Sequence, residues 1–304
     1  MNSNDSGWIQ IAVTVPGERA AEAEALLFEA GAASVTLLDA GDHPLHEPQP
    51  GHTPIWPEVV VQALMAADFN RTRLIDRLSA AGLLADPSAI AFEPLAARDW
   101  ERAWMDEYRP MRFGRNLWIC PWHLEPEPGW GVVVRLDPGL AFGSGTHPTT
   151  ALCLEWIDGQ ELADLDVIDY GCGSGVLAIA CALSGAARVI AVDHDRQALR
   201  ATADNARRNG VEAGIETMLP ADFDALEPEA RRADIILANI LAGPLVSLAP
   251  RLKACRRPGA RMVLSGILPE QAARVETAYR EPGGRIETTI RDGWVRMVVH
   301  ANGA

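Results

Sequence analysis

Of the 304 residues, 48% are apolar and 22% are charged, proportions typical of a folded globular protein that exclude a disordered or fibrous chain. The length favours two domains. The net charge of −14 would repel a phosphate backbone, so we expect no direct contact with nucleic acid and, instead, a basic partner.

The sequence also bears on where the protein acts. No window approaches the ~18 consecutive apolar residues of a membrane span, and the first residues lack the basic and apolar regions of a secretory signal. Five scattered cysteines form no C-x-x-C pair, which disfavours a disulfide framework and a zinc site. We therefore expect a cytoplasmic protein without membrane contact or bound metal, with a monomer as the default. Apart from Lys253, every residue counted as Lys or Arg is arginine, and we interpret this as a bias of the proteome in amino-acid usage.

Residues 1–97 are predicted to form a small α+β domain. Six segments alternate as strand, helix, strand, strand, helix, strand, and they span 8–15, 18–30, 34–38, 59–64, 71–81 and 89–92. This order is typical of a ferredoxin-like sandwich. A loop rich in proline, histidine and glycine occupies 41–57, and we interpret its histidines as solvated loop residues rather than metal ligands.

Residues 98–111 are predicted to be a linker helix. Trp100, Trp104 and Tyr108 recur every four residues and would share one face of it, an aromatic stripe that favours packing over ligand binding. We interpret the segment as a hinge between two domains of different composition.

Residues 112–304 are predicted to form a Rossmann-like, doubly wound α/β domain. Strand-like runs at 117–120 and 132–136 come first. Strands and helices then alternate, with strands at 166–169, 188–192 and 234–238 and helices starting at 174 and 196. Because the ligands of such sheets bind at the carboxyl ends of the parallel strands, the residues that follow each strand are the candidate site.

The first of these strands ends in the pattern D-x-G-x-G-x-G, from Asp169 to Gly175. Such glycines let the backbone turn tightly and approach a ligand closely, and we count Gly171 and Gly173 as candidate cofactor contacts. A dehydrogenase fingerprint would need glycine where Val176 stands. An acid in this loop suits a cationic ligand with an amino group better than a pyrophosphate. A purely structural turn is the alternative.

Asp193 ends the next strand, 22 residues after Gly171. This is close to the ~20-residue spacing at which a strand-end acid binds the hydroxyls of a ribose. The alternative, a cap for the helix that starts at 196, suits Asp195 better. Loop and acid together predict a nucleoside ligand.

Two further strand ends supply polar candidates. Asn239 closes an apolar strand over the centre of the sheet, where an amide could hold a substrate amine, and a helix cap is the alternative. Asp222, beside Phe223, is predicted to end a strand and to accept a hydrogen bond from an adenine amino group. A surface turn explains Asp222 equally well.

The segment 137–150, rich in glycine and threonine, is predicted to be a lid or first wall of the ligand site. We count Phe142, Thr146 and Thr150 as candidate cofactor contacts, while the alternative for Thr150 or its neighbour Thr149 is a helix N-cap. His147 is accompanied by no serine, cysteine or aspartate set, and we treat a catalytic role for it as secondary.

Several of these segments resemble the PrmA family of S-adenosylmethionine-dependent methyltransferases, which modify the ribosomal protein called L-eleven. The resemblance runs from about residue 99 to 266 and rests on the segments 100–120, 139–150, 169–175 and 239–245. It implies a class I Rossmann-like fold, S-adenosylmethionine as cofactor, and a small N-terminal domain that grips the ribosomal protein. Position by position, the family's cofactor contacts fall on Thr150, Gly171, Asp193 and Asn239.

The resemblance implies methyl transfer to lysine side chains and to an N-terminal α-amine. A neutral amine would attack the sulfonium methyl carbon in line, so the protein would chiefly position the two partners. A lysine with a pKa of ~10.4 must first lose its proton, which a desolvating pocket favours. The Asn239 side chain and the Ile240 carbonyl would accept hydrogen bonds from the amine. We predict that no general base is essential.

Other functions compete with this one. A methyltransferase of the same fold could act on another protein, an RNA or a small molecule. The acidic N-terminal domain and the sequence Asn-Ile-Leu-Ala, which lacks an aromatic residue for stacking, count against a nucleobase. A binding module that has lost its chemistry should show damage at Gly171, Asp193 or Asn239, and the sequence shows none. The missing third glycine of the fingerprint disfavours a dehydrogenase.

Overall fold

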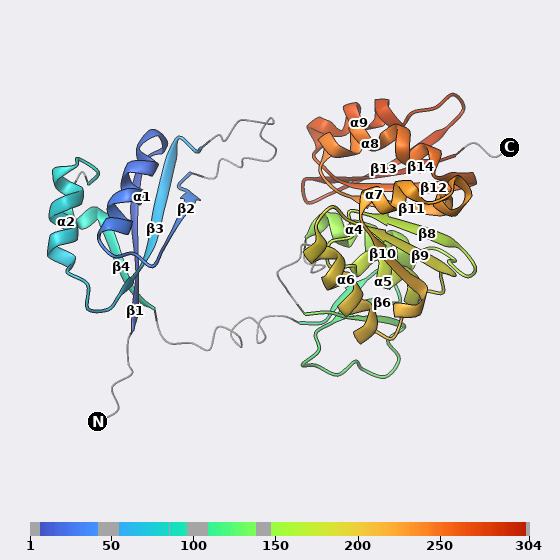
Figure 1. The fold of residues 1–304 in the computed structure, drawn as a ribbon, viewed down its shortest axis with the longest axis horizontal. Helices are drawn as coiled ribbons and strands as arrows, with labels where there is room; N and C mark the ends of the chain where they lie inside the picture. Colours follow the sequence, from blue (N-terminus) through green and yellow to red (C-terminus); the bar gives the residue numbers. More distant parts are fainter. Residues whose placement is uncertain (1–6, 42–54, 85, 96–108, 138–146, 302–304) are drawn as a thin grey trace. The chain divides into compact units, whose positions relative to one another are not determined.

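The computed structural model describes residues 7–41, 55–84, 86–95, 109–137 and 147–301. The chain divides into two compact units, 1–104 and 105–304, which Figure 1 colours from blue to cyan and from green to red. Among the described residues, no helix is long and apolar enough to span a membrane. The predicted linker helix falls mostly on 98–108, outside the described residues, and Met111, predicted to belong to it, instead opens a strand.

The N-terminal unit is a four-stranded antiparallel sheet with two helices. Its elements are β1 (Trp8–Pro16), α1 (Ala20–Glu29), β2 (Ser34–Asp39), β3 (Glu58–Ala66), α2 (Arg71–Ala80) and β4 (Ile90–Leu95). The strands lie in the order β2-β3-β1-β4. Buried and more exposed side chains alternate along β1 and β3, because one face packs against the helices through residues such as Ile11, Leu27 and Leu74. The predicted order of strands and helices is confirmed.

The C-terminal unit is built on a seven-stranded sheet in the order β10-β9-β8-β11-β12-β14-β13. Its strands are β8 (Asp166–Tyr170), β9 (Arg188–Val192), β10 (Ile215–Met218), β11 (Ala233–Asn239), β12 (Arg256–Ile267), β13 (Arg285–Arg291) and β14 (Trp294–His300). The strands β8 to β12 run parallel, whereas β13 and β14 form an antiparallel edge. A separate small sheet contains β5 (Met111–Phe113), β6 (Leu117–Cys120) and β7 (Val132–Arg135).

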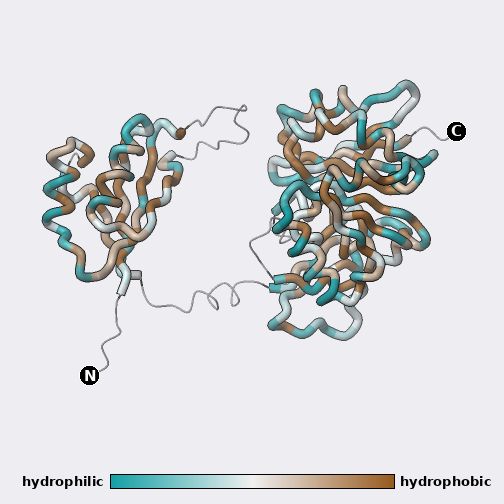
Figure 2. Tube along the Cα trace, in the orientation of Figure 1, coloured by the Kyte–Doolittle hydropathy of each residue, from teal (hydrophilic) through white to brown (hydrophobic). Residues whose placement is uncertain are grey.

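Helices cover both faces of the large sheet. They are α4 (Pro148–Asp158), α5 (Val176–Leu183), α6 (Arg196–Arg208), α7 (Pro220–Ala225), α8 (Ala242–Ala254) and α9 (Ala272–Tyr279). Val167 and Ile235 pack in one core with α4, α5 and α6, while their chain neighbours Ile168 and Ile236 pack in a second core with α7, α8 and α9. Figure 2 shows the resulting hydrophobic strands inside the unit. The predicted doubly wound Rossmann-like fold is therefore confirmed.

The prediction that a strand ends at Asp222 is wrong. The strand β10 ends at Met218, and Pro220 then starts α7, so Asp222 lies in the first turn of a helix. Proline has no backbone N–H for the sheet ladder, and its fixed φ suits the first position of a helix.

The single lysine of the sequence, Lys253, lies in the last turn of α8. Its side chain is 23% exposed, and its Nζ lies 3.9 Å from Oε1 of Glu281. The neighbouring Arg256 donates a 2.6 Å hydrogen bond to the same oxygen. Lys253 is therefore paired at a helix end where a cation is also favoured by the helix dipole.

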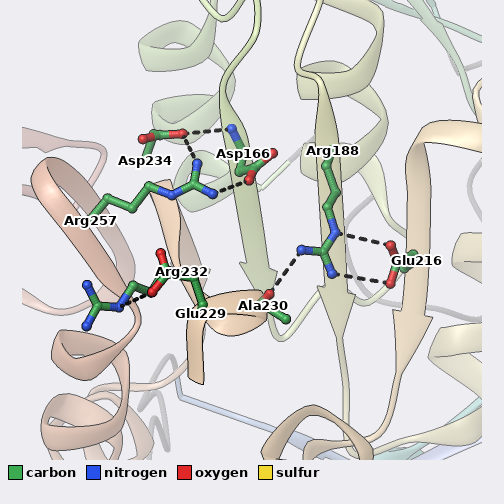
Figure 3. A network of polar contacts seen from close by, with 8 residues as sticks. All are labelled: Asp166, Arg188, Glu216, Glu229, Ala230, Arg232, Asp234 and Arg257. Atoms are coloured by element: carbon green, nitrogen blue, oxygen red, sulfur yellow. Dashed lines mark hydrogen bonds and ion pairs between the residues drawn. The ribbon is translucent and has the colours of Figure 1, made fainter. Parts of the chain in front are cut away.

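Charged side chains join the strands at the amino-terminal edge of the parallel sheet (Figure 3). Arg257, near the start of β12, donates hydrogen bonds to Asp166 Oδ2 at 2.6 Å and to Asp234 Oδ2 at 2.9 Å. The same oxygen of Asp234 accepts from the backbone N of Asp166 at 2.9 Å. Arg188, at the start of β9, likewise donates to Glu216 on β10. This edge thus ties β8 to β11 and β12, and β9 to β10.

We expect Arg257→Met to lower the free energy of unfolding by about 2 kcal/mol, because it leaves the carboxylates of Asp166 and Asp234 close together without their shared cation. Arg232→Met is the matched control. Arg232 is 42% exposed and pairs with Glu229 at 3.5 Å, one helical turn away, so we expect a change within about 0.5 kcal/mol. Urea unfolding followed by circular dichroism measures both changes, and equal losses would contradict the role given to Arg257.

Candidate active site

The glycine-rich loop follows β8 directly and leads into α5. Gly171 adopts a φ of +86°, a left-handed conformation that favours glycine. A Cβ at this position would lie 2.3 Å from Cγ2 of Ile240, which follows β11. Gly171 is therefore required both by its conformation and by the close approach of the segment after β11.

Asp193, at the end of β9, holds the loop in place. Its side chain is almost completely buried. One carboxylate oxygen accepts from the backbone N of Gly173 at 3.0 Å, and the other accepts from the backbone N of Asp195 at 2.9 Å. Asp195 in turn caps α6 by accepting from the N of Gln197 at 2.8 Å, so the helix-cap role belongs to Asp195, as predicted.

The middle of α6 supports the same loop. Thr202 donates to the carbonyl of Gly173 at 3.0 Å, and Asn205 donates to the carbonyl of Ser174 at 2.9 Å. Sequence reasoning missed these two residues. Both lie in the middle of a helical pattern about thirty residues after the loop, and nothing local distinguishes them from surface positions.

Asp169 opens the loop motif but is not among the cofactor contacts predicted from the sequence. It is 1% exposed, and its Oδ2 accepts from the backbone N of Ala178 at 3.1 Å. Its buried Oδ1 has no hydrogen-bond partner among the described residues. Burial raises the pKa of this carboxyl to about 7, an effect that the charge of Asp193 increases and the Ala178 N–H opposes. An unpaired buried carboxylate oxygen suits a cationic donor.

Asn239 and Thr150 come together although 89 residues separate them in the sequence. Asn239 ends β11, and its Nδ2 donates to Oγ1 of Thr150, in the first turn of α4, at 3.2 Å. Thr150 is completely buried, and Asn239 is partly exposed. The helix-cap alternative for Asn239 is wrong, because Leu241 occupies the N-cap position of α8.

The helix-cap alternative for Thr149 and Thr150 is also wrong. The N-cap of α4 is His147, whose Nδ1 lies 3.3 Å from the backbone N of Thr149 and 2.7 Å from its Oγ1. The rings of His147 and Trp294 pack edge to face, with 4.8 Å between their centroids. Partial burial lowers the pKa of His147. His147 therefore fixes the start of the helix that carries Thr150.

The structure thus gathers most of the candidate residues at the carboxyl ends of β8, β9 and β11. Gly171 meets Ile240, Gly173 is bound by Asp193, and Asn239 is bound to Thr150. Asp222 is exposed on α7, and no described contact joins it to the others. Phe142 and Thr146 lie outside the described residues.

Comparison with known proteins decides the family. The family model described as ribosomal protein L11 methyltransferase (PrmA) matches residues 7–302. The chain belongs to the PrmA family. Curated proteins named ribosomal protein L11 methyltransferase from Pseudomonas aeruginosa are 52% identical to it over 95% of this chain and 97% of theirs. One from Azotobacter vinelandii is 51% identical over 95% of this chain and 98% of its own length.

Among solved structures, a ribosomal protein L11 methylase from Lactobacillus delbrueckii subsp. bulgaricus is 31% identical. It aligns over 64% of this chain and all of its own length with a TM-score of 0.58. The family match also includes residues 7–98, for which the sequence alone indicated no more than a shared architecture. The resemblance read from the motifs is confirmed.

We expect Asp193→Asn to weaken the binding of S-adenosylmethionine, the cofactor that the PrmA motifs imply, by about tenfold to a hundredfold. The change removes a charged acceptor for ribose hydroxyls and weakens the bond to the loop. Titration calorimetry measures the affinity. Asp195→Asn is the matched control, because asparagine caps a helix as well as aspartate does and should leave the affinity unchanged. Equal affinities for wild type and Asp193→Asn would show that the acid does not hold the cofactor.

Asp169 should make stability fall as the pH rises. Its pKa in the folded chain, about 7, lies above its ordinary value of 3.8, so between these values the folded state holds a proton that the unfolded state has released. We therefore expect wild type to lose more unfolding free energy between pH 5 and pH 8 than Asp169→Asn does. Asp204→Asn, on the exposed face of α6, should keep the wild-type dependence. Parallel curves for wild type and Asp169→Asn in urea unfolding would refute this origin.

Proposed function

We propose that this chain transfers methyl groups from S-adenosylmethionine to lysine side-chain and N-terminal α-amines of ribosomal protein L11. The observation that carries the proposal is the meeting of Asn239 and Thr150 beside the glycine loop, with Asp193 bound to that loop. The groups proposed to bind the nucleoside and the amide proposed to bind the amine thus share one edge of the sheet.

The residues present fit the cofactor. Asp193 would accept hydrogen bonds from its ribose hydroxyls, and the Gly171 backbone would lie close to it because no side chain intervenes. The buried Oδ1 of Asp169, without a described partner, would attract its cationic amino group. Phe142, Thr146 and Asp222 remain predicted contacts. When bound, the cofactor supplies an activated methyl group on a sulfonium.

The chain's own contribution to the reaction is to hold a neutral amine in line. The Nδ2 of Asn239 donates to Thr150, and the Oδ1 of Asn239 makes no hydrogen bond among the described residues. This Oδ1 and the carbonyl oxygen of Ile240 would each accept one hydrogen bond from the amine and thereby aim its nitrogen lone pair. Removal of the amine from water would lower its pKa, and its proton would leave to solvent, so no general base is essential.

The N-terminal unit, with a proposed extent of 1–97, would hold the substrate. The first 100 residues of the chain contain 14 acidic and 5 basic side chains, a balance that would attract a basic ribosomal protein. Residues 98–111 would join it to the methyltransferase domain at 112–304 as a hinge. The same balance disfavours nucleic acid. We place the reaction in the cytoplasm, with the enzyme a monomer.

The test is to incubate the purified protein with S-adenosylmethionine labelled in its methyl group and with salt-washed ribosomal proteins from a strain that lacks this gene. We expect label on L11, at lysines or at its N-terminus, located by gel and mass spectrometry. Asn239→Ala should lower turnover at saturating cofactor by about a hundredfold, because the amine loses an acceptor that orients it. Asn116→Ala, an exposed asparagine in the turn between β5 and β6, is the matched control and should keep full activity.

Each outcome bears on the proposal. Label on an RNA, on another protein or on a small amine would leave the methyltransferase assignment intact and replace the substrate. Full turnover by Asn239→Ala with cofactor bound would overturn the proposed amine-binding role.

A further inference from the structure

The strand β12 is irregular where it passes the segment after β11. Asn239 pairs with Ser265, so Ile240 lies level with Gly266. On the other side of β12, the pairing with β14 shifts between Leu264 and Ile267, which marks a β-bulge that includes Gly266. Gly266 has a φ of +84°. Bulges with left-handed glycines occur often beside active sites, where they redirect the backbone.

Gly266 is in close contact with the peptide that follows β11. A Cβ at position 266 would lie 2.4 Å from the carbonyl oxygen of Ile240, 2.9 Å from its carbonyl carbon and 3.2 Å from its nitrogen. All three are backbone atoms, so no rotation of a side chain relieves the overlap. The absence of a side chain at 266 therefore allows the Ile240 carbonyl to occupy its present place.

We propose that Gly266 is a positioning residue that fixes the Ile240 carbonyl where it accepts a hydrogen bond from the substrate amine. The inference rests on the proposed function. Gly171 meets the same residue differently, since a Cβ there would overlap the Cγ2 atom of Ile240 and not its backbone. The side chain of Ile240 is thus limited by Gly171, and its carbonyl is limited by Gly266.

A second glycine of β12 supplies a matched control. Gly259 has a φ of +77°, close to that of Gly266, but a Cβ at this position would have no atom within 4 Å among the described residues. Alanine at either position adopts an unfavourable left-handed conformation. Only at position 266 does the added methyl group also overlap with the Ile240 peptide and so displace it.

The experiment compares Gly266→Ala and Gly259→Ala in the full-length chain. Titration calorimetry gives the affinity for S-adenosylmethionine, and methylation of purified L11 gives kcat and KM. We expect Gly259→Ala to lower the melting temperature without changing kcat. For Gly266→Ala we expect a kcat at least about tenfold lower at saturating cofactor and substrate, with cofactor affinity within about twofold of wild type. If the role of Gly266 were purely structural, the substitution would lower the melting temperature without lowering kcat at unchanged cofactor affinity.

Wild type that binds the cofactor but leaves L11 unmodified would refute the proposed substrate. Wild type that methylates L11, with Gly266→Ala equal to Gly259→Ala in kcat, would overturn the role of Gly266 alone.

A second comparison covers the case in which Gly266→Ala does not fold. In the double variant Ile240→Gly and Gly266→Ala, a glycine at 240 lets the peptide rotate away from the new methyl group and so permits folding. The carbonyl remains but is displaced. We expect its kcat to be at least about tenfold below that of Ile240→Gly alone, and equal values would overturn the proposal.

Discussion

The order of strands in the large sheet reverses between β8 and β11, and the residues that the structure gathers into the candidate site depend on that reversal. From β8 the sheet grows outward through β9 and β10, and the chain then returns to place β11 and β12 on the other side. As a result, α5 leaves β8 toward one face, whereas α8 leaves β11 toward the other. The first residues after the two strands remain at the edge, where Gly171 and Ile240 meet.

The two edges of the parallel sheet differ in how their carboxylates are paired. At the amino-terminal edge, Arg257 pairs with both carboxylates that lie beside it. At the carboxyl edge, Asp169 keeps a buried oxygen without a described partner, and its pKa is raised accordingly. An unpaired buried polar atom costs stability unless a ligand completes it. The structure therefore accepts this cost where the cofactor is proposed to bind, whereas the carboxylates of Asp166 and Asp234 at the opposite edge are paired.

Much of this arrangement could be predicted from sequence because the signals are local. Apolar strand runs predict the fold, and the spacing of the glycines together with the acid after β9 predicts most of the candidate binding edge. The errors have physical causes. The N-cap of α4 is a histidine, a residue type that does not ordinarily cap helices. The segment at Asp222 is helical because Pro220 begins α7 there. Thr202, Asn205 and Gly266 lie against neighbours that are distant in sequence, and spacing does not reveal such contacts.

The presence of a single lysine limits how far the enzyme can methylate itself. An enzyme that methylates lysine amines offers its own lysines as competing acceptors at the highest local concentration. This chain has one such side chain, Lys253, and it is paired with Glu281 at the end of α8. Its other 26 basic residues are arginines, whose guanidinium groups do not lose a proton in proteins and so present no free lone pair. The composition thus leaves the enzyme nearly free of acceptors for its own reaction.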